Sequence, residues 1–331
     1  MSFTVCTIGC GRHSSEVHGP SCARYAAAMP DVTLAACCDV DPARAEAYRA
    51  RFDYLRAYTD VAEMLDRERP DAVNLIVPAP VMAALAERIL GRGIPLLMEK
   101  PPGLNGSEVR RLIRAASRAG TPHMVAFNRR FLPLVARLRA CLEEEFRPGQ
   151  IRYIRYELVR TARTEPDFSD TAVHAVDTAR FIAGSAYKEA RIVYHELPEA
   201  GRGVANIFLH GWFESGARFS IEVCPTAGAV LERAEVHLDG HSFILHIPIW
   251  NQFDAPGRLL HLADGRPVLD LDGAGLAGGA DVYLTGGFYA EISRFFDDIR
   301  AGHAPVADLA SSLQSVQIMH CIHKRARSYQ G

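Results

Sequence analysis

Over the first 127 residues, apolar residues gather in short continuous runs, and stretches with helical spacing separate them. Such runs, rich in β-branched residues, are typical of strands buried on both faces of a parallel sheet. They lie at Thr4–Ile8, Thr33–Cys38, Ala72–Val77, Pro95–Met98 and Met124–Phe127, with a weaker run near Tyr54–Tyr58. Helices are expected at Pro42–Phe52, Val61–Arg67, Val81–Leu90 and Glu108–Ala119, the last capped by Ser107. The alternation predicts a doubly wound α/β domain.

From residue 128 onward the pattern changes to alternating runs with fewer helices between them. Helices are expected at Pro133–Phe146 and Asp170–Ala183, and near Phe288–Arg300 and Leu309–Arg327. Strand patterns lie at Gln150–Val159, Ala190–Tyr194, Val204–Phe213, Ala217–Val223, Ala229–Leu238 and Ser242–Ile247. Consecutive alternating strands predict a mostly antiparallel sheet. Residues 251–285 are rich in Gly, Pro and Asp and are expected to form a loop.

The composition is that of a globular protein. With 48% hydrophobic and 23% charged residues, the 331-residue chain is unlike disordered, collagen-like or coiled-coil proteins. A net charge of −2 argues against a domain specialised for nucleic acid. The sequence contains no run of about 20 apolar residues, so no membrane span is expected. The N-terminus resembles a first strand rather than a signal peptide. The eight cysteines lack the spacing of a disulfide framework or zinc site, so we expect reduced thiols in a cytoplasmic protein.

A glycine-rich turn, Gly9-Cys10-Gly11-Arg12-His13-Ser14, follows the first predicted strand. A dinucleotide site needs a tight turn, a close backbone approach to the pyrophosphate and exposed N–H groups at a helix start. Gly9 and Gly11 suit the first two needs. Ser14 replaces the usual third glycine, so we expect slightly looser packing between helix and strand. Such a motif is often just a turn, and its place in the alternating pattern favours the dinucleotide interpretation.

Asp39 ends the second predicted strand. An acid at this position can accept hydrogen bonds from a ribose 2′-hydroxyl and repels a 2′-phosphate, which favours NAD over NADP. Alternatively, Asp39 or Asp41 only caps the following helix. Asp41 suits that role better, since it directly precedes Pro42.

Lys100 follows a strand in the segment Glu99-Lys100-Pro101-Pro102. The carboxyl ends of strands in such a sheet border the ligand crevice. Of the 37 Lys and Arg residues 34 are arginine, so a lysine here favours a need for an amine that can lose its proton. A plain surface lysine is the alternative.

Asp170, His174 and Asp177 have the spacing i, i+4 and i+7, which places them on one stripe of a predicted helix. A carboxylate beside an imidazole fixes its tautomer and suits it to proton transfer near neutral pH. A solvated polar face is the alternative. A metal is not expected, because no third nitrogen or sulfur ligand lies nearby in the sequence. Arg129, Arg160 and Arg163 are candidates for holding a phosphate or carboxylate of a substrate, or are simply exposed.

The order of these motifs resembles the Gfo/Idh/MocA family of oxidoreductases over nearly the whole chain. The matching segments are Gly9-Cys10-Gly11, Cys38-Asp39-Val40-Asp41-Pro42, Glu99-Lys100-Pro101, Asn128-Arg129-Arg130-Phe131, Asp170 to Gly184 and Gly287-Phe288-Tyr289-Ala290-Glu291. The resemblance implies a Rossmann dinucleotide-binding domain over 1–127. It also implies a substrate and oligomerisation domain over 128–331 with an open, mostly antiparallel sheet. Its C-terminal helices would pack back on the first domain, and the protein would be a homodimer or homotetramer.

The resemblance implies an NAD(P)-dependent oxidoreductase acting on a secondary alcohol or ketone of a sugar, cyclitol or nucleotide sugar. It makes Lys100, Asp170 and His174 the catalytic residues, with His174 moving the proton. The cofactor-binding candidates are Gly9, Gly11, Arg12, His13, Ser14, Asp39, Pro78, Glu99 and Lys100. The substrate-binding candidates are Arg129, Arg160, Arg163 and Asp177. An NAD-dependent glycosidase with transient oxidation and a non-catalytic cofactor-binding regulator are the alternatives.

Two positions depart from the family pattern. Met82 stands where many members carry a histidine, which puts a role for that position in cofactor or substrate contact in doubt. His18 lies one place beyond the usual histidine after the glycine turn, so no role is assigned to it.

Overall fold

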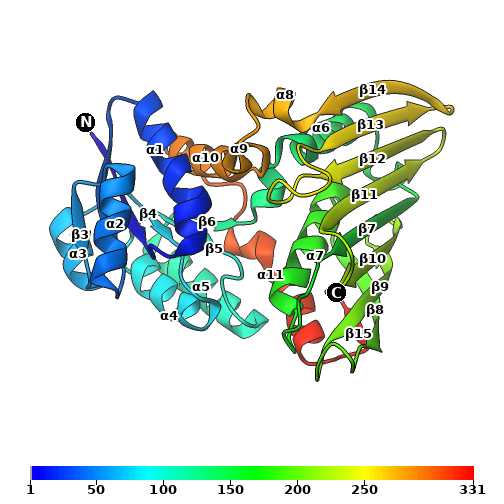
Figure 1. Ribbon diagram of the computed structural model, residues 1–331, viewed down its shortest axis with the longest axis horizontal. Coiled ribbons are helices and arrows are strands. Elements are labelled where there is room, and N and C mark those ends of the chain that lie inside the picture. Colours follow the sequence, from blue (N-terminus) through cyan, green and yellow to red (C-terminus); the bar gives the residue numbers. More distant parts are fainter. Residues whose placement is uncertain (1) are drawn as a thin grey trace. The chain divides into compact units, whose positions relative to one another are not determined.

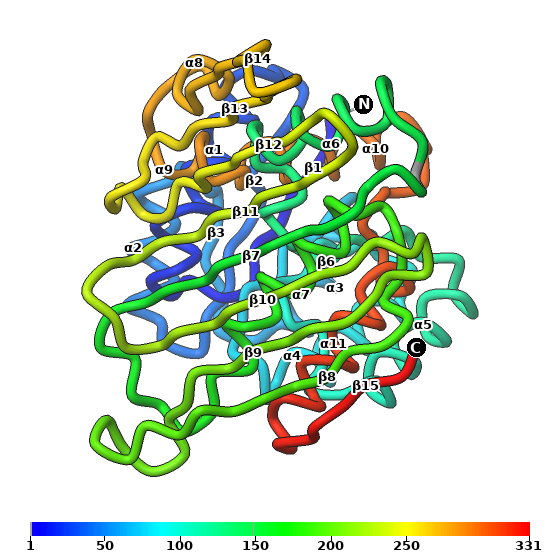
Figure 2. The backbone as a smooth tube through the Cα atoms, turned by 90° about the vertical axis from the view of Figure 1, so that its right-hand side faces the viewer, coloured from blue at the N-terminus to red at the C-terminus, as the bar shows by residue number. Residues whose placement is uncertain are grey.

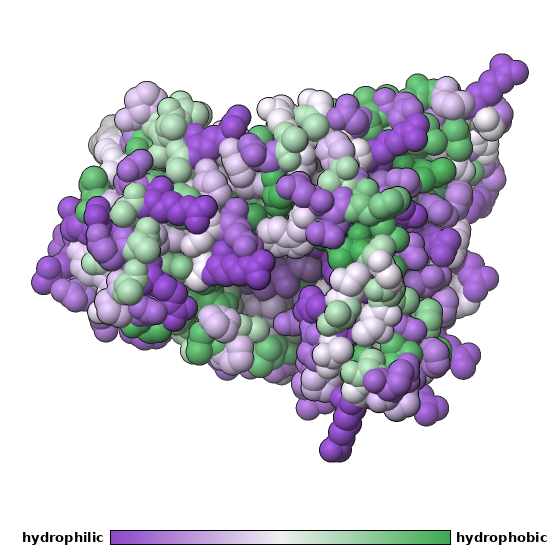
Figure 3. All heavy atoms as spheres, in the orientation of Figure 1, coloured by the Kyte–Doolittle hydropathy of each residue, from purple (hydrophilic) through white to green (hydrophobic). Residues whose placement is uncertain are grey.

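The computed structural model describes residues 2–331, which divide into two compact units (Figure 1). The first unit contains the chain up to Phe127 together with Phe288–Leu313. The second contains Asn128–Gly287 and Gln314–Gly331. On the face seen in Figure 3, hydrophilic residues are spread over both units and hydrophobic ones form smaller patches. Within residues 2–331, no helix has the length and apolarity that a membrane span requires.

The first unit is built on a six-stranded parallel sheet with the order β3-β2-β1-β4-β5-β6. The strands are β1 (Phe3–Ile8), β2 (Val32–Cys38), β3 (Arg56–Tyr58), β4 (Ala72–Leu75), β5 (Leu96–Glu99) and β6 (His123–Ala126). The predicted doubly wound α/β fold is confirmed. The strand order reverses between β1 and β4, and sheets of this class bind ligands at such a switch point.

Helices cover this sheet. They are η1 (Ser14–His18), α1 (Gly19–Ala28), α2 (Pro42–Phe52), α3 (Val61–Glu68), α4 (Ala79–Leu90), α5 (Gly106–Ala119) and α10 (Phe288–Ala301). The distant segment α10 packs on α1, where the ring of Phe296 contacts Tyr25. Asp41 caps α2, accepting from the N–H groups of residues 43 and 44. The cap of α5 is Asn105 and not Ser107, because the Asn105 side chain accepts from two N–H groups of the first turn.

The second unit is built on a nine-stranded sheet, which Figure 2 shows from its face. Its order is β14-β13-β12-β11-β7-β10-β9-β8-β15. The strands are β7 (Tyr153–Val159), β8 (Tyr187–Glu196), β9 (Ala205–Phe213), β10 (Arg218–Cys224), β11 (Leu231–Leu238), β12 (His241–Ile247), β13 (Arg258–Ala263), β14 (Arg266–Asp272) and β15 (Ser328–Gln330). All described neighbours are antiparallel except β7 and β10. The predicted mostly antiparallel sheet is therefore confirmed.

The helical segments of the second unit are η2 (Asn128–Phe131), α6 (Pro133–Glu145), η3 (Pro148–Gln150), α7 (Ser169–Ala183), α8 (Gly273–Ala277) and α9 (Val282–Thr285). Helix α11 (Leu309–His323) begins in the first unit and continues into the second from Gln314 onward. Helix α7 packs against β7 and β10 in the middle of the sheet. Its apolar residues Val176, Ala179 and Ile182 join the buried core with inward side chains of the strands. This packing fixes α7, which bears the candidate residue His174.

Two segments differ from expectation. The predicted loop over 251–285 instead contains β13, β14, α8 and α9. Its Gly, Pro and Asp residues mark turns between short elements, and β14 lies at the sheet edge with most side chains exposed, so its pattern is not apolar. The three-residue strand β15, which pairs with β8, was not expected, because three residues leave too short a pattern.

Candidate active site

The glycine turn between β1 and η1 has the geometry that a dinucleotide requires. Gly9 has a φ of +94°, and a Cβ atom at this position would lie 1.9 Å from the carbonyl oxygen of Ile76. Gly9 therefore cannot be replaced by a larger residue without moving the backbone. A Cβ on Gly11 would meet no atom within 4 Å, so the backbone there stands open to a ligand.

Gly9 and Gly11 line a pocket of about 730 Å³ within the first unit, together with Asp39, Arg44 and Pro78. The Asp39 carboxylate accepts from the N–H of Cys10 and from the N–H of Asp41, both at 2.9 Å. It thereby ties the end of β2 to the glycine turn. Two backbone donors leave lone pairs of this carboxylate for further donors such as ribose hydroxyls. The turn and the pocket thus fit a dinucleotide.

At the end of β5, the buried carboxylate of Glu99 gathers three donors. His18 Nε2 lies 2.7 Å and His13 Nε2 lies 3.1 Å from the same oxygen, Oε1. The backbone N–H of Lys100 donates to the other oxygen at 2.9 Å. Burial lowers the pKa of His18, so its neutral imidazole is the donor to Glu99. Burial opposes ionisation of Glu99, but His13 and His18 hold the pKa of this carboxyl well below its usual range.

His18 reaches Glu99 from η1, which is a π-helical turn. Such a turn has i→i+5 hydrogen bonds and is wider than an α-helical turn. Ser14 begins it and is fully buried, with its hydroxyl bound to the Tyr48 hydroxyl at 3.0 Å.

His13, His18 and Glu99 are also the described residues whose ligand atoms, within 4.8 Å of one another, could hold a metal ion. Their distances are those of hydrogen bonds to a shared oxygen. A metal ion with bonds of about 2.0–2.2 Å would have to enter between atoms that already touch.

In the second unit, the three residues of the predicted stripe on α7 differ in their burial and in their partners. His174 is buried at 9% exposure and Asp170 is exposed. Asp177 is fully enclosed, where Arg130 binds both its oxygens at 2.7 and 2.6 Å and the Ser315 hydroxyl donates at 2.8 Å. Asp177 is therefore occupied by an internal ion pair.

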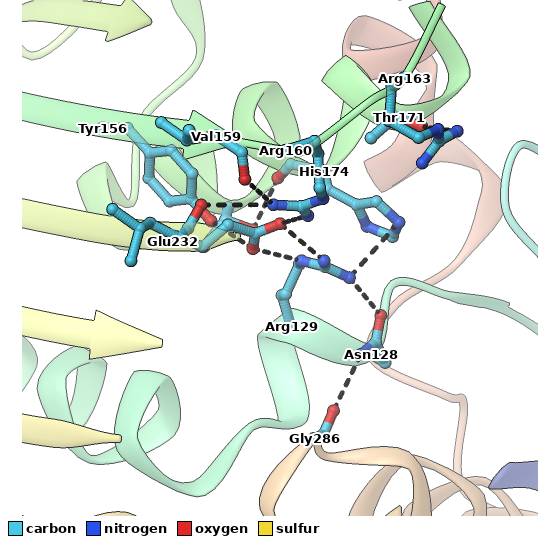
Figure 4. Close-up of polar contacts among 12 residues, drawn as sticks. Asn128, Arg129, Tyr156, Val159, Arg160, Arg163, Thr171, His174, Glu232 and Gly286 are labelled. Carbon is cyan, nitrogen blue, oxygen red and sulfur yellow. Dashed lines mark hydrogen bonds and ion pairs between the residues drawn. The ribbon is translucent and has the colours of Figure 1, made fainter. Parts of the chain in front are cut away.

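His174 belongs to a buried network whose polar contacts are drawn in Figure 4. Arg129, on η2, lies with Nη1 3.3 Å from His174 Nε2. Its Nε and Nη2 each lie 2.8 Å from an oxygen of Glu232, which has no exposed surface. Arg160, at the end of β7, binds the same carboxylate, and the Tyr156 hydroxyl lies 3.2 Å from it. Burial opposes ionisation of Glu232, but Arg129 and Arg160 lower its pKa to about 2.

The other sequence candidates have simpler surroundings. Arg163 is paired with Glu165, and its guanidinium lies 5.1 Å from the centre of the Phe168 ring. Met82 is buried in α4. Arg12 is exposed and paired with Glu16 at 2.7 Å. The structure thus gathers His13, Glu99 and the Lys100 amide in the first unit, and Arg129, Arg160 and His174 in the second.

Sequence reasoning missed Glu232 and His18. Glu232 shares the inward face of β11 with Ala234, Val236 and Leu238, so a charged residue at a core position was a readable signal. The signal for His18 was a histidine one place beyond the usual position of the family, and the π-helical turn that brings it to Glu99 could not be read from the sequence.

The fold and the glycine-turn site define a class: α/β proteins with a dinucleotide-binding unit. Residues 3–127 match the family described as "Oxidoreductase family, NAD-binding Rossmann fold". The resemblance to the Gfo/Idh/MocA oxidoreductases noted in the sequence is therefore confirmed for residues 3–127.

The relatives found include sugar and cyclitol dehydrogenases. D-apiose dehydrogenase of Paraburkholderia graminis is 29% identical over 53% of this chain and 50% of its own length. Inositol 2-dehydrogenase of Rhizobium meliloti is 28% identical over 54% of each chain. The chain thus matches about half the length of these curated relatives. A Gfo/Idh/MocA family oxidoreductase from Vibrio cholerae has a TM-score of 0.80, 21% identity and 98% coverage of both chains, which shows the shared fold.

Proposed function

We propose that this protein is an NAD(P)-dependent dehydrogenase or reductase that acts on a secondary alcohol or ketone of a sugar, cyclitol or nucleotide sugar. The observation that carries the proposal is the pocket beside Gly9, Gly11 and Asp39, where a side chain at Gly9 would strike the backbone. The substrate class rests on the relatives, which are named for apiose and inositol.

NAD is the proposed cofactor. Asp39 would accept the ribose hydroxyls and oppose a 2′-phosphate, since its carboxylate lines the pocket. The open backbone at Gly11 and the start of η1 would receive the pyrophosphate. Ser14 is buried against Tyr48, so in this proposal its contribution is limited to its backbone N–H.

The proposed chemistry divides between cofactor and protein. When bound, the nicotinamide ring supplies hydride acceptance from the substrate carbon, or donation in the reverse direction. His174 takes the hydroxyl proton, while the O–H electron pair stays with oxygen and forms the carbonyl bond. Lys100 donates a hydrogen bond to that oxygen and stabilises the charge that builds on it. Asp170 orients His174 or a substrate hydroxyl.

A neutral polyol suits this site better than an anionic substrate. The guanidinium groups of Arg129 and Arg160 are bound to Glu232, and that of Arg163 is paired with Glu165. The sequence proposal that these arginines hold a phosphate or carboxylate would therefore require a substrate that competes with protein carboxylates.

We also propose a cytoplasmic homodimer or homotetramer. All eight cysteines are free thiols, as a reducing compartment allows. The sheet face turned away from the buried core bears Val193, Phe208 and Trp212, which are partly exposed apolar residues on adjacent strands. Pairing of that face with a second copy would bury them.

The test is absorbance at 340 nm with NAD and NADP against free hexoses, cyclitols, sugar phosphates and nucleotide sugars. We expect turnover on one class, faster with NAD, and a loss of at least tenfold in His174→Ala. A loss below tenfold would contradict the role of His174. Release of an aglycone without net NADH would indicate the glycosidase, and tight NADH binding without turnover would indicate the regulator. Failure to bind either cofactor would overturn the proposal.

A further inference from the structure

Arg129 and His174 make a contact whose direction is determined by chemistry. The two atoms, Arg129 Nη1 and His174 Nε2, lie 3.3 Å apart (Figure 4). A guanidinium has five N–H donors and no acceptor, and it stays charged in proteins. His174 Nε2 must therefore be the acceptor, which requires an unprotonated Nε2. A neutral imidazole with a free Nε2 carries its hydrogen on Nδ1.

Arg129 has little freedom to turn away from His174. Glu232 binds its Nε and Nη2 in a fork with both distances at 2.8 Å. The remaining nitrogen, Nη1, also donates to the side-chain oxygen of Asn128 at 3.1 Å, and the Asn128 amide donates to the Gly286 carbonyl at 2.8 Å. A planar guanidinium held on one edge by two bonds aims its opposite nitrogen in a fixed direction.

The charges around the imidazole also disfavour a second proton. Within this unit, the titratable and charged side chains of the network and of helix α7 are Arg129, Arg160, Glu232, Tyr156, Asp170, Asp177 and Arg180, and Arg130 lies next to Arg129 on η2. Glu232 is one anion shared by two guanidinium groups, so the network retains a positive charge. Asp177 is bound by Arg130, and Asp170 is exposed to solvent, where its charge is screened.

We propose that Arg129 is a positioning residue that holds His174 as the neutral Nδ1–H tautomer, and that Glu232 and Arg160 hold Arg129 in place for this purpose. The catalytic consequence rests on the proposed function. A contact at 3.3 Å is at the long end of hydrogen bonds, so the Nε2 lone pair can also accept from a substrate hydroxyl while Arg129 stays in place. That nitrogen then receives the hydroxyl proton, and the adjacent guanidinium favours its later release.

The structure offers a matched control in the next residue. Arg129 and Arg130 are 7% and 8% exposed, and each binds a buried carboxylate through two nitrogens. The contact with His174 belongs to Arg129. The conservative substitutions Arg129→Lys and Arg130→Lys both retain the charge and an ion pair. They differ in that only Arg129→Lys removes the guanidinium that contacts His174.

The experiment is long-range ¹H–¹⁵N NMR of the full chain with ¹⁵N-labelled histidine, which distinguishes the two imidazole tautomers without any substrate. His174→Gln identifies the signals of His174. We expect the Nδ1–H tautomer in the unsubstituted protein at pH 7.5. Arg129→Lys should convert it to the Nε2–H form, which free imidazole side chains favour, or to a mixture, whereas Arg130→Lys should leave it unchanged. Arg129→Gln should move the titration midpoint of His174 upward by about one pH unit.

An Nε2–H signal in the unsubstituted protein would overturn the proposal, and so would equal effects of the two lysine substitutions. Circular dichroism separates an altered tautomer from an unfolded variant, and the spectrum of the unsubstituted protein tests the proposal even if a variant fails to fold. If the tautomer is as expected and no alcohol in the panel is turned over, the proposed function fails while the positioning of His174 stands.

Discussion

Each unit holds a buried carboxylate between two nitrogen-bearing side chains, but the partners differ in kind. In the first unit Glu99 accepts from His13 and His18, and in the second Glu232 accepts from Arg129 and Arg160. Imidazole changes its charge near neutral pH, whereas guanidinium does not. Both carboxyl groups have lowered pKa values, but their partners respond to pH very differently.

The difference indicates two uses of the same arrangement. The Glu232 cluster is a permanent ion network, which suits the proposed task of holding the resting imidazole of His174 in one tautomer. The Glu99 cluster joins the helical turn after the glycines to the segment that bears Lys100, with donors that need not be charged. The Glu99 cluster can therefore hold the local geometry without placing a fixed positive charge beside Lys100.

The largest difference between the two clusters should appear when each carboxylate becomes an amide. Glu232→Gln leaves two buried guanidinium groups without a counter-charge, which typically costs about 3–5 kcal/mol. Both tryptophans, Trp212 and Trp250, belong to the second unit, so urea unfolding followed by tryptophan fluorescence reports its stability. A loss below about 1 kcal/mol would mean that Arg129 and Arg160 find other partners.

Glu99→Gln should cost less. The amide oxygen can still accept from His18, and the neutral imidazole of His18 leaves no buried charge behind, so we expect about 1–3 kcal/mol from the weakened hydrogen bonds. The first unit contains five buried cysteines at positions 6, 10, 22, 37 and 38. Thiol labelling in increasing urea, read by mass spectrometry, therefore reports its unfolding. A loss as large as that of Glu232→Gln would remove the distinction between the clusters.

The smallest effect is the difference in pH dependence. The pKa of folded His18 is lowered, so the unfolded chain binds more protons below about pH 6.5, and the first unit should lose stability as pH falls from there. The loss is at most about 1.4 kcal/mol per pH unit for one proton. Glu232, with a pKa lowered from 4.5 to about 2, should withdraw its contribution from the second unit as pH falls between those values. The same two unfolding probes, applied from pH 7.5 to 3, should therefore give separate profiles.

The matched control for the pH profile is His18→Gln, which should flatten the decline of the first unit between pH 6.5 and 5. If the unsubstituted first unit is equally stable from pH 7.5 to 5, His18 does not behave as a buried neutral imidazole.

Much of the architecture was predictable, because local patterns determine it. The continuous apolar runs located the parallel strands, and the position of Asp41 before Pro42 located a helix cap. The pairing of Glu232 with two arginines was not predictable, since those residues are 72 and 103 positions apart from it. The fate of Asp177 was hidden for the same reason: helical spacing gives the face of a residue, but not whether a distant arginine occupies it.

The π-helical turn at Ser14–His18 has a consequence for how residues 3–127 align with the family that they match. A wider turn accommodates one additional residue while the helix on either side continues, so the chain can lengthen by one between the glycines and the histidine without displacing the imidazole from Glu99. An insertion of this kind leaves the position of the imidazole in space unchanged but shifts the histidine by one residue in a sequence alignment. Searches that count residues from the glycine turn would then discard members that keep the histidine in space.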